Sequence, residues 1–229
     1  MKMRVFLSVI LWTWVLTVGA KNIETRFDGK KITNDVFWNT AEGMPLYSQG
    51  GGIFRYPDPD TGRLRYYWYG VRYAEAVRYR EDPSVTYPAC TFEAVTCYSS
   101  DNLINWYYEG DVLTREEVDR YGRAGWVGRM GVAYLEAWNQ YVLVVQHDNG
   151  VLFALSHTPN GRFTWHRRIT MEKIIGTPNT GDQTVFVDED TRKPYLIYSY
   201  GRGRNRIYVS EIGIRDGQVD LLDCTQVFK

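Results

Sequence analysis

The chain has 229 residues, of which 44% are hydrophobic and 15% aromatic, so it is long enough to bury a core within a single large β domain. Lysine plus arginine and aspartate plus glutamate number 27 each, and this zero formal charge disfavours nucleic acid or another polyanion as a partner. The three cysteines lack the spacing of metal ligands.

Residues 1–20 have the pattern of a secretory signal. Lys2 and Arg4 precede an apolar run, and Val18-Gly19-Ala20 offers a small-residue cleavage site. The run is too short for a comfortable membrane span, so no membrane-spanning helix is predicted. We therefore expect a secreted or periplasmic protein whose folded domain covers residues 21–229.

A β-hairpin is predicted from Leu46 to Gly70. Two runs rich in aromatic and β-branched residues flank the turn-forming segment 57–62, which is Pro-Asp-Pro-Asp-Thr-Gly. Three consecutive glycines, Gly50 to Gly52, precede the first strand. They indicate a close approach of the backbone, either to crowded neighbouring strands or to a ligand, and the sequence leaves both open.

The segment that follows the hairpin contains a loop and another strand. Residues 71–90, rich in Arg, Tyr and Pro, are predicted to form a loop that is either solvated or grips a sugar. Residues 92–98 alternate as a strand, and Ser99 to Asn102 form a turn whose side chains bond their own backbone. Cys97 is expected to be a buried thiol, with a disulfide to Cys90 as the alternative in an exported protein.

The strand and turn pattern recurs along the chain. Aromatic or aliphatic strands at 66–69, 141–145 and 195–198 each follow a strand that ends in a polar turn. Short strands repeated in this way are typical of propeller blades, and the sequence supplies about three. One weak helix is predicted, at 114–121.

Three segments resemble glycoside hydrolase family 43, and its exo-β-1,3-galactanase-like branch in particular. They are Asn39-Thr-Ala-Glu-Gly-Met-Pro-Leu-Tyr-Ser-Gln-Gly-Gly-Gly-Ile53, Tyr66-Tyr-Trp-Tyr-Gly70 and Cys97-Tyr-Ser-Ser-Asp-Asn-Leu-Ile-Asn-Trp106. The resemblance implies an all-β fold, a β-propeller of the five-bladed glycosidase type with a sugar site at the central axis. Only about three blades are present, so the propeller is expected to be incomplete: a fragment, a shortened reading frame, or a chain that pairs with a second chain.

The resemblance also locates the chemistry. An inverting glycosidase needs a carboxylic acid and a carboxylate about 6.5 to 9.5 Å apart. In this branch the second blade has a Glu-Arg-Pro-like motif, and here the Arg is Arg129 while the Glu position is Gly128. The third-blade acid becomes Gln183, and Gln49 replaces the usual histidine of the first blade. Glutamine cannot donate a proton as a carboxylic acid does, and losing a general acid removes roughly 10²- to 10⁴-fold in rate.

The predicted site residues follow from this placement. Gln183 and the adjacent Asp182 are the candidates at the catalytic position, although strand alternation aims Asp182 away from Gln183 and favours a structural role for it in a turn. The candidates for substrate binding are Gln49, Trp68, Arg72 and Arg129. Of His147 and Asp148, one is expected to lie on the surface and the other to hydrogen-bond the backbone of a turn. His157 and His166 are expected to be solvated.

Two functions from different classes remain open. The first is a glycoside hydrolase-like protein that hydrolyses galactan or arabinogalactan-type side chains. The second is a non-catalytic carbohydrate-binding propeller. A third hypothesis, a sialidase-like propeller, is weaker because such enzymes need an arginine triad that cannot be assigned in this sequence. The partner in either of the first two cases is an oligo- or polysaccharide. No cofactor is predicted, and no metal site.

Overall fold

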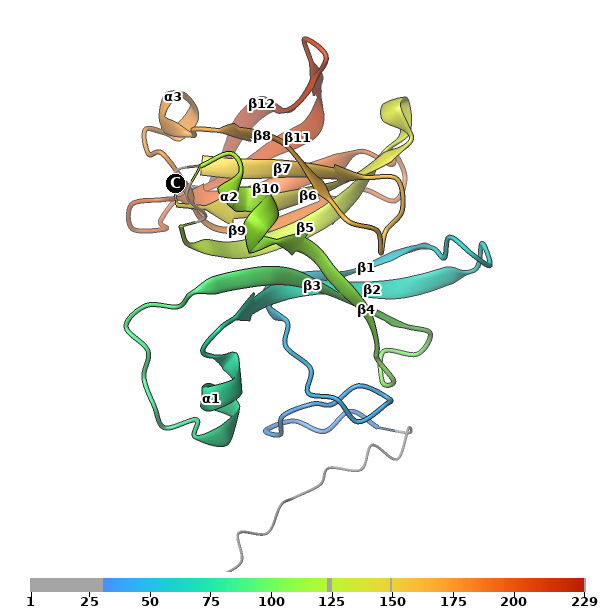
Figure 1. Cartoon of the computed structure of the whole chain (residues 1–229). Helices are drawn as coiled ribbons and strands as arrows, with labels where there is room; N and C mark the ends of the chain where they lie inside the picture. The colour runs from blue at the N-terminus through green and yellow to red at the C-terminus, as the bar shows by residue number, and fades with distance from the viewer. Residues whose placement is uncertain (1–30, 123–124, 149, 229) are drawn as a thin grey trace, which may run out of the picture.

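A computed structural model describes residues 31–122, 125–148 and 150–228, so the predicted signal segment lies outside the described residues. The described chain forms three four-stranded antiparallel sheets in chain order (Figure 1). The first sheet contains β1 Gln49–Pro57, β2 Leu64–Tyr73, β3 Phe92–Ser100 and β4 Tyr107–Thr114. The second contains β5 Val127–Leu135, β6 Gln140–His147, β7 Gly150–Ser156 and β8 Thr164–Ile169. The third contains β9 Thr180–Val187, β10 Pro194–Tyr200, β11 Ile207–Arg215 and β12 Gln218–Phe228.

The first strands of the three sheets, β1, β5 and β9, lie side by side. They run in the same direction, because Gly50 approaches Arg129 near the strand starts and the Tyr56 hydroxyl donates to the Val132 carbonyl oxygen (2.7 Å) further along. This is the arrangement of blades around a propeller hub. The expected all-β propeller with three blades is therefore confirmed.

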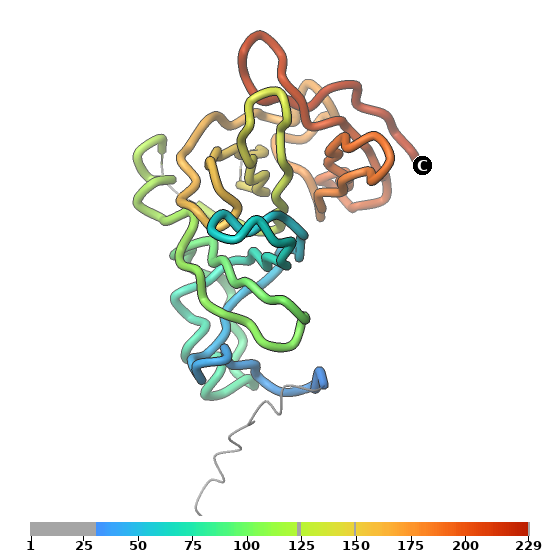
Figure 2. Tube along the Cα trace, turned by 90° about the vertical axis from the view of Figure 1, so that its right-hand side faces the viewer, coloured from blue at the N-terminus to red at the C-terminus, as the bar shows by residue number. Residues whose placement is uncertain are grey.

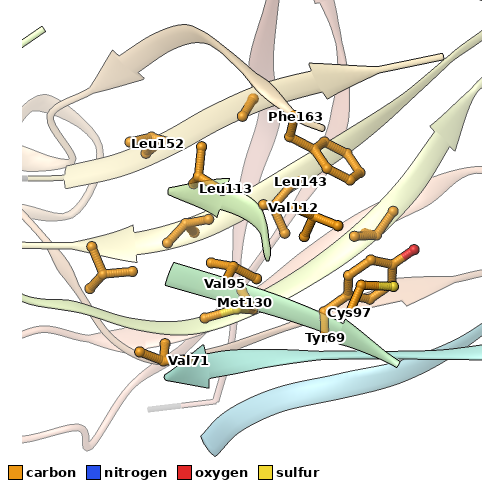
Figure 3. Packing of buried hydrophobic residues seen from close by; sticks show 14 of the residues in the cluster. Tyr69, Val71, Val95, Cys97, Val112, Leu113, Met130, Leu143, Leu152 and Phe163 are labelled. Atoms are coloured by element: carbon orange, nitrogen blue, oxygen red, sulfur yellow. The ribbon is translucent and has the colours of Figure 1, made fainter. Parts of the chain in front are cut away.

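Two cores hold the blades together, one on each face of the second sheet. Met130, Leu143 and Leu152 pack toward the first sheet, where Tyr69 and Cys97 meet them (Figure 3). The alternate residues Val142, Val144 and Phe153 pack toward Leu196 and Tyr198 of the third sheet. Because successive strand residues point to opposite faces, the middle blade is apolar on both faces and reads as a continuous hydrophobic run.

Of the helices in the described residues, the sequence predicts only one. The predicted helix near 114–121 is present as α2, Arg115–Asp119, and the Thr114 hydroxyl caps it by accepting from the Glu117 N–H (3.3 Å). The insertion predicted as a loop contains a helix, α1, Ala76–Glu81, so that prediction was wrong. Its charged sequence has no buried face, which is why periodicity missed it. Shorter turns of helix are α3, Glu172–Ile175, and the 3₁₀ turn Glu136–Trp138.

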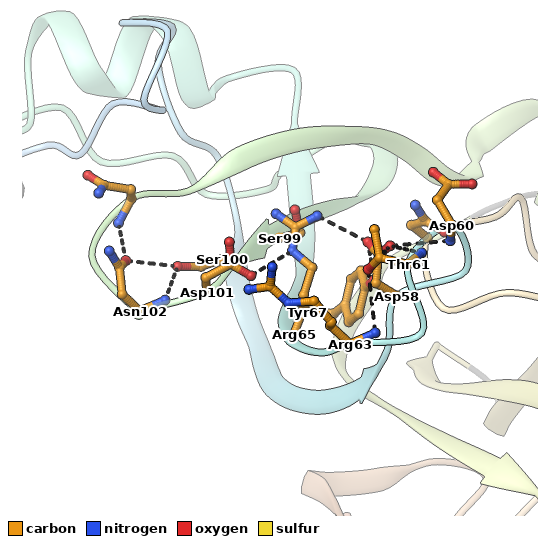
Figure 4. Close-up of polar contacts among 12 residues, drawn as sticks. Asp58, Asp60, Thr61, Arg63, Arg65, Tyr67, Ser99, Ser100, Asp101 and Asn102 are labelled. Carbon is orange, nitrogen blue, oxygen red and sulfur yellow. Dashed lines mark hydrogen bonds and ion pairs between the residues drawn. The ribbon is translucent and has the colours of Figure 1, made fainter.

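The outer turns of the first and third sheets repeat the same design. Asp58 Oδ1 accepts from the Thr61 N–H (2.9 Å) and the Thr61 hydroxyl (2.8 Å), and Asp188 does the same with Thr191 (2.7 and 2.8 Å). In the first sheet, Arg65 also contacts Asp58 (3.2 Å) and Asp101 (3.1 Å) (Figure 4). The predicted turn at 99–102 is confirmed in part: Ser99 and Ser100 still belong to β3, and the turn follows them, where the Asn102 side chain accepts from the backbone of Ile104 and Asn105.

The two ends of the blade stack are covered differently. The N-terminal segment, blue in Figures 1 and 2, lies beyond the first sheet and covers part of its outer face through Trp38, which packs edge-on against Trp68. At the other end, Phe186 on the outer face of the third sheet is half exposed. In the described ranges no helix is long and apolar enough to cross a membrane.

Candidate functional site

The site predicted from the sequence lies where the three inner strands begin, which we call the mouth. It is formed by the starts of β1, β5 and β9: residues 49–50, 127–129 and 180–183. Gln183 Nε2 donates to the Arg129 carbonyl oxygen (3.2 Å) and joins the starts of β9 and β5, and the Arg129 side chain lies against Gly50 of β1. The structure therefore brings Gln49, Arg129, Asp182 and Gln183 to one end of the hub.

The glycine run at the mouth serves close packing of the backbone. A Cβ on Gly51 would lie 1.7 Å from the Tyr69 carbonyl oxygen, which no side chain tolerates. Gly50 has φ of +68° at a break in strand register, and a Cβ there would lie 2.9 Å from an Arg129 guanidinium nitrogen. Crowding accounts for these glycines, and Arg129 lies directly against the backbone of Gly50.

A cluster of two arginines and one aspartate occupies the mouth. Arg129 Nε donates to Asp182 Oδ1 (3.1 Å), and Arg204 lies 3.4 Å from the other carboxylate oxygen. The Asp182 side chain is 50% exposed and that of Arg129 is 42% exposed. Asp182 belongs to β9, so the expectation of a turn residue was wrong. It is the carboxylate that the third blade presents to solvent at the mouth.

Gln183 is held inside the protein. It is only 7% exposed, its amide NH₂ donates to the Arg129 carbonyl oxygen, and its carbonyl oxygen accepts from the Thr180 hydroxyl (2.8 Å). The prediction that Asp182 and Gln183 point in opposite directions is confirmed. The sequence resemblance nevertheless suggested that Gln183 would face the axis, and the structure gives its amide a structural task between β5 and β9.

Gly128 lies beneath an aromatic ring that sequence reasoning missed. A Cβ on Gly128 would lie 2.1 Å from the indole of Trp126, which is 39% exposed. The Tyr73 hydroxyl contacts Trp126 and donates to the Val127 carbonyl oxygen (2.7 Å), and burial raises the pKa of Tyr73 to about 12. The signal available in the sequence was a tryptophan two residues before the glycine at the expected carboxylate position. Trp126 fills the space that a carboxylate side chain at position 128 would need.

A cavity of about 680 Å³ opens beside the mouth, between the first sheet, the N-terminal segment and the insertion that carries α1. Gln49 and Trp68 line it, together with aromatic residues from both segments: Phe37, Trp38, Tyr47, Tyr73, Tyr79 and Tyr87. Trp68 is also packed edge-on against Trp106 (5.2 Å between centroids), so its ring position is fixed. The cavity is concave and mostly apolar with a few polar groups, as ligand sites commonly are.

Arg72 is separate from this group of residues. Its two terminal nitrogens lie 2.8 Å from the two carboxylate oxygens of Asp111, and its Nε lies 3.1 Å from Glu93. All three nitrogens are thus bound to acids of the first sheet. Arg72 does not line the cavity, in contrast to its neighbours Val71 and Tyr73. The structure thus places Arg72 apart from the other predicted site residues, and its role in substrate binding stays a prediction.

The histidine and cysteine expectations are partly confirmed. The Asp148 carboxylate accepts from the Trp126 N–H (2.8 Å), so it is the backbone ligand of its pair. Its neighbour His147 is buried, 3.5 Å from an Arg168 nitrogen, rather than on the surface. His166 is half-buried and accepts from the Val219 N–H (3.1 Å), so the expectation that it is solvated was wrong.

All three cysteines are free. Cys97 is buried as predicted, and this excludes the alternative disulfide to Cys90 in this structure. No cluster of three or more His, Cys, Asp or Glu residues that could hold a metal ion occurs in the part of the chain that the structure describes. The polar and aromatic groups at the mouth are the guanidinium groups of Arg129 and Arg204, the Asp182 carboxylate and the Trp126 indole. Groups of these kinds can form hydrogen bonds with a sugar and stack on its ring.

Comparison with solved structures gives the class of fold. An exo-β-1,3-galactanase from Clostridium thermocellum is 26% identical over 83% of this chain, with a TM-score of 0.62. A β-1,3-galactosidase of family 43, solved with galactodeoxynojirimycin, is 20% identical over 86%, with a TM-score of 0.64. A scan against family models and a search of curated proteins find no match. The described chain has the fold of the glycoside hydrolase family 43 propellers.

Within that class, the resemblance is to the galactanases and galactosidases. The chain covers 40% of the Clostridium enzyme and 66% of the galactosidase, so three blades correspond to part of their length. An exo-β-1,3-galactanase from Phanerochaete chrysosporium, 20% identical over 83% of this chain and covered over 41% of its own length, was solved as a glutamate-to-glutamine variant with β-1,3-galactotriose (TM-score 0.61). The family resemblance inferred from sequence motifs is thus confirmed in three dimensions.

Proposed function

We propose that this protein binds a galactan or arabinogalactan-type oligosaccharide at the mouth and its adjoining cavity without hydrolysing it at an ordinary glycosidase rate. One observation carries the proposal. Both expected carboxylate positions lack a carboxyl group: Gly128 is covered by the Trp126 indole, and the Gln183 amide is locked by two hydrogen bonds. Inverting hydrolysis needs two carboxyl groups across the bond, so the absence of both removes the proton transfer that hydrolysis requires.

The binding surface itself supports the proposal. Trp126 presents a half-exposed ring at the mouth, and the aromatic residues around Trp68 give the cavity flat apolar walls. Arg129 and Asp182 offer charged donors and acceptors for sugar hydroxyl groups. The Phanerochaete galactanase variant, in which a glutamate is replaced by glutamine, was solved with galactotriose, and this supports sugar binding by a propeller of this fold that carries such a replacement.

The test combines calorimetry with a sensitive hydrolysis assay. We expect β-1,3-galactotriose to bind with a Kd of roughly 10 μM to 1 mM, corresponding to about 4 to 7 kcal/mol, and no galactose to be released. Trp126→Ala should weaken binding, whereas Tyr107→Ala, which removes an exposed aromatic residue at the opposite end of the first sheet, should not. Turnover that Gln183→Ala abolishes would refute the proposal and favour the second candidate, a hydrolase.

The hydrolase candidate retains one specific observation in its favour. Asp182 is an exposed carboxylate at the hub end of the third blade, close to where the resemblance places the acid. Its loss through Asp182→Asn would abolish hydrolysis if this group transferred the proton. A binding protein would show no hydrolysis in either form.

We also propose that the protein acts outside the cytoplasm, because residues 1–20 have the composition of a cleaved export signal. Amino-terminal sequencing of the protein recovered from the culture medium or periplasm should begin at Lys21. Recovery from the cytoplasm with Met1 still present would contradict this part of the proposal.

A further inference from the structure

The loop between β10 and β11 places three arginines beside the mouth. It spans residues 201–206, and its sequence is Gly-Arg-Gly-Arg-Asn-Arg. Tyr200, at its base, pairs with Thr180 of β9, and the Tyr200 N–H donates to the Arg206 carbonyl oxygen (2.9 Å). A Cβ on Gly201 would lie 2.6 Å from the Asn179 carbonyl oxygen, so the loop packs directly on the segment that leads into β9.

The charges at the mouth do not balance. Asp182 is shared between Arg129 and Arg204, so one carboxylate faces two guanidinium groups. Arg202 and Arg206 are exposed on the same loop, and Arg206 is held with its guanidinium carbon 5.0 Å from the centre of the Tyr200 ring. Asp148 also lies nearby and accepts from the Trp126 N–H, so four arginines stand against two aspartates. An excess of positive charge thus adjoins the proposed sugar site, although the whole chain is neutral.

We propose that the mouth selects a glycan that carries an acidic group, a uronate carboxylate or a sulfate ester, and that Arg204 and Arg202 bind this group. The inference rests on the proposed sugar binding and narrows its substrate class. Guanidinium groups present paired N–H donors that match two oxygens of a carboxylate or sulfate. Because the arginines are exposed at the rim, their effect should be moderate and should weaken as salt rises.

The experiment compares three ligands by titration calorimetry: β-1,3-galactotriose, the same oligomer ending in glucuronate, and the same oligomer carrying one sulfate. We expect the anionic ligands to bind about 3- to 10-fold more tightly than the neutral one at low salt, with most of this ratio lost in 0.5 M NaCl. Arg204→Gln and Arg202→Gln should each reduce the ratio. Arg63→Gln, which removes a matched charge from the turn at the far end of β1 and β2, should leave it unchanged.

The possible results distinguish a preference for acidic glycans from the proposed sugar binding itself. Equal affinity for neutral and anionic oligomers would overturn the acidic-ligand inference and leave sugar binding standing. Failure of all three oligomers to bind would refute the proposed function as well. A loss in Arg204→Gln that is the same for neutral and charged ligands would show that this arginine only maintains the site, contrary to the inference. A preference for either the uronate or the sulfate alone supports it and identifies the acidic group.

Discussion

Arg129 and Asp182 face each other across the hub, with Nε and Oδ1 3.1 Å apart, and so join the second blade to the third. Each residue lies near the start of its inner strand, and the two are 53 positions apart in the sequence. Both side chains are about half exposed, so solvent screens their attraction, and exposed ion pairs contribute little to stability. The pair is therefore expected to contribute little to folding, which leaves both side chains accessible for the proposed ligand binding.

Replacing Asp182 by Asn should separate these two roles. The free energy of unfolding should change by less than about 1 kcal/mol, because the pair is exposed. The affinity for a neutral galactotriose should fall, since the acceptor for a sugar hydroxyl becomes weaker and Arg129 loses its orientation. Urea unfolding and calorimetry measure the two effects. A large loss of stability with unchanged affinity would contradict the assignment.

Trp126 and Gly128 should behave as a coupled pair in a double-mutant cycle. Gly128→Ala places a methyl group within the volume of the indole, and overpacking of this kind costs roughly 1 to 3 kcal/mol. The same substitution in a Trp126→Ala background should cost much less, because the ring is gone. Gly110→Ala is not a matched control, since its φ is +136°. The Trp126→Ala background itself serves as the control, and equal costs in both backgrounds would contradict the packing argument.

The fold could be predicted largely from the sequence because its signals are local. The alternation in residues 92–98 and the Pro-Asp-Thr-Gly chemistry of the Asp58 turn fix strands and turns without distant information. The recurrence of these units then indicated blades. The helix α1 escaped prediction because it has no buried face and so no hydrophobic period.

The site was predicted less fully because it depends on which way side chains point where strands begin. The register of β9 breaks between the partners of Tyr198 and Tyr200. Strand alternation predicts opposite directions for Asp182 and Gln183, but the family motif does not show that Thr180 and Arg129 occupy the Gln183 amide. Arg72 was expected at the sugar because arginine beside tyrosine suits glycans. Its partner Asp111 lies 39 residues away, and only the folded sheet places them together.

Arg72→Gln tests whether Arg72 is structural. The fork to Asp111 and the contact to Glu93 are only partly exposed, so their loss should destabilise the fold by roughly 1 to 2 kcal/mol. Glycan affinity should not change, because the side chain does not line the cavity. Arg78→Gln, an exposed arginine in α1, is the matched control and should leave stability unchanged. A lower affinity in Arg72→Gln with intact stability would restore the sequence-based prediction that Arg72 binds the substrate.

Gln183→Glu should make stability depend on pH. A buried carboxylate at this position would face the Arg129 carbonyl oxygen and lose the donated hydrogen bond, so the folded state favours the protonated acid and raises its pKa. A raised folded pKa means that stability falls as pH rises above the unfolded value of about 4.3. The variant should therefore match wild type near pH 4 and be less stable by roughly 1 to 3 kcal/mol at pH 8. Thermal unfolding across this range measures the difference, and Gln183→Met, which cannot titrate, should show no such slope.

Asp58 should stabilise the first hairpin only at pH values at which its carboxyl group is ionised. Hydrogen bonds from Thr61, and then contact with Arg65, lower the pKa of Asp58 to about 2, so its contribution is present above the unfolded pKa of about 3.9 and is lost as pH falls toward 2. Asp58→Asn should cost roughly 1 to 2 kcal/mol at pH 7, and this gap should close between about pH 4 and pH 2. Asp188→Asn alters the corresponding turn of the third sheet, where, among the described residues, the carboxylate accepts a side-chain hydrogen bond from Thr191 alone, and should have a smaller effect. Urea unfolding at a series of pH values measures both variants, and an Asp58→Asn gap that is as large at pH 2 as at pH 7 would show that shape rather than charge makes the turn.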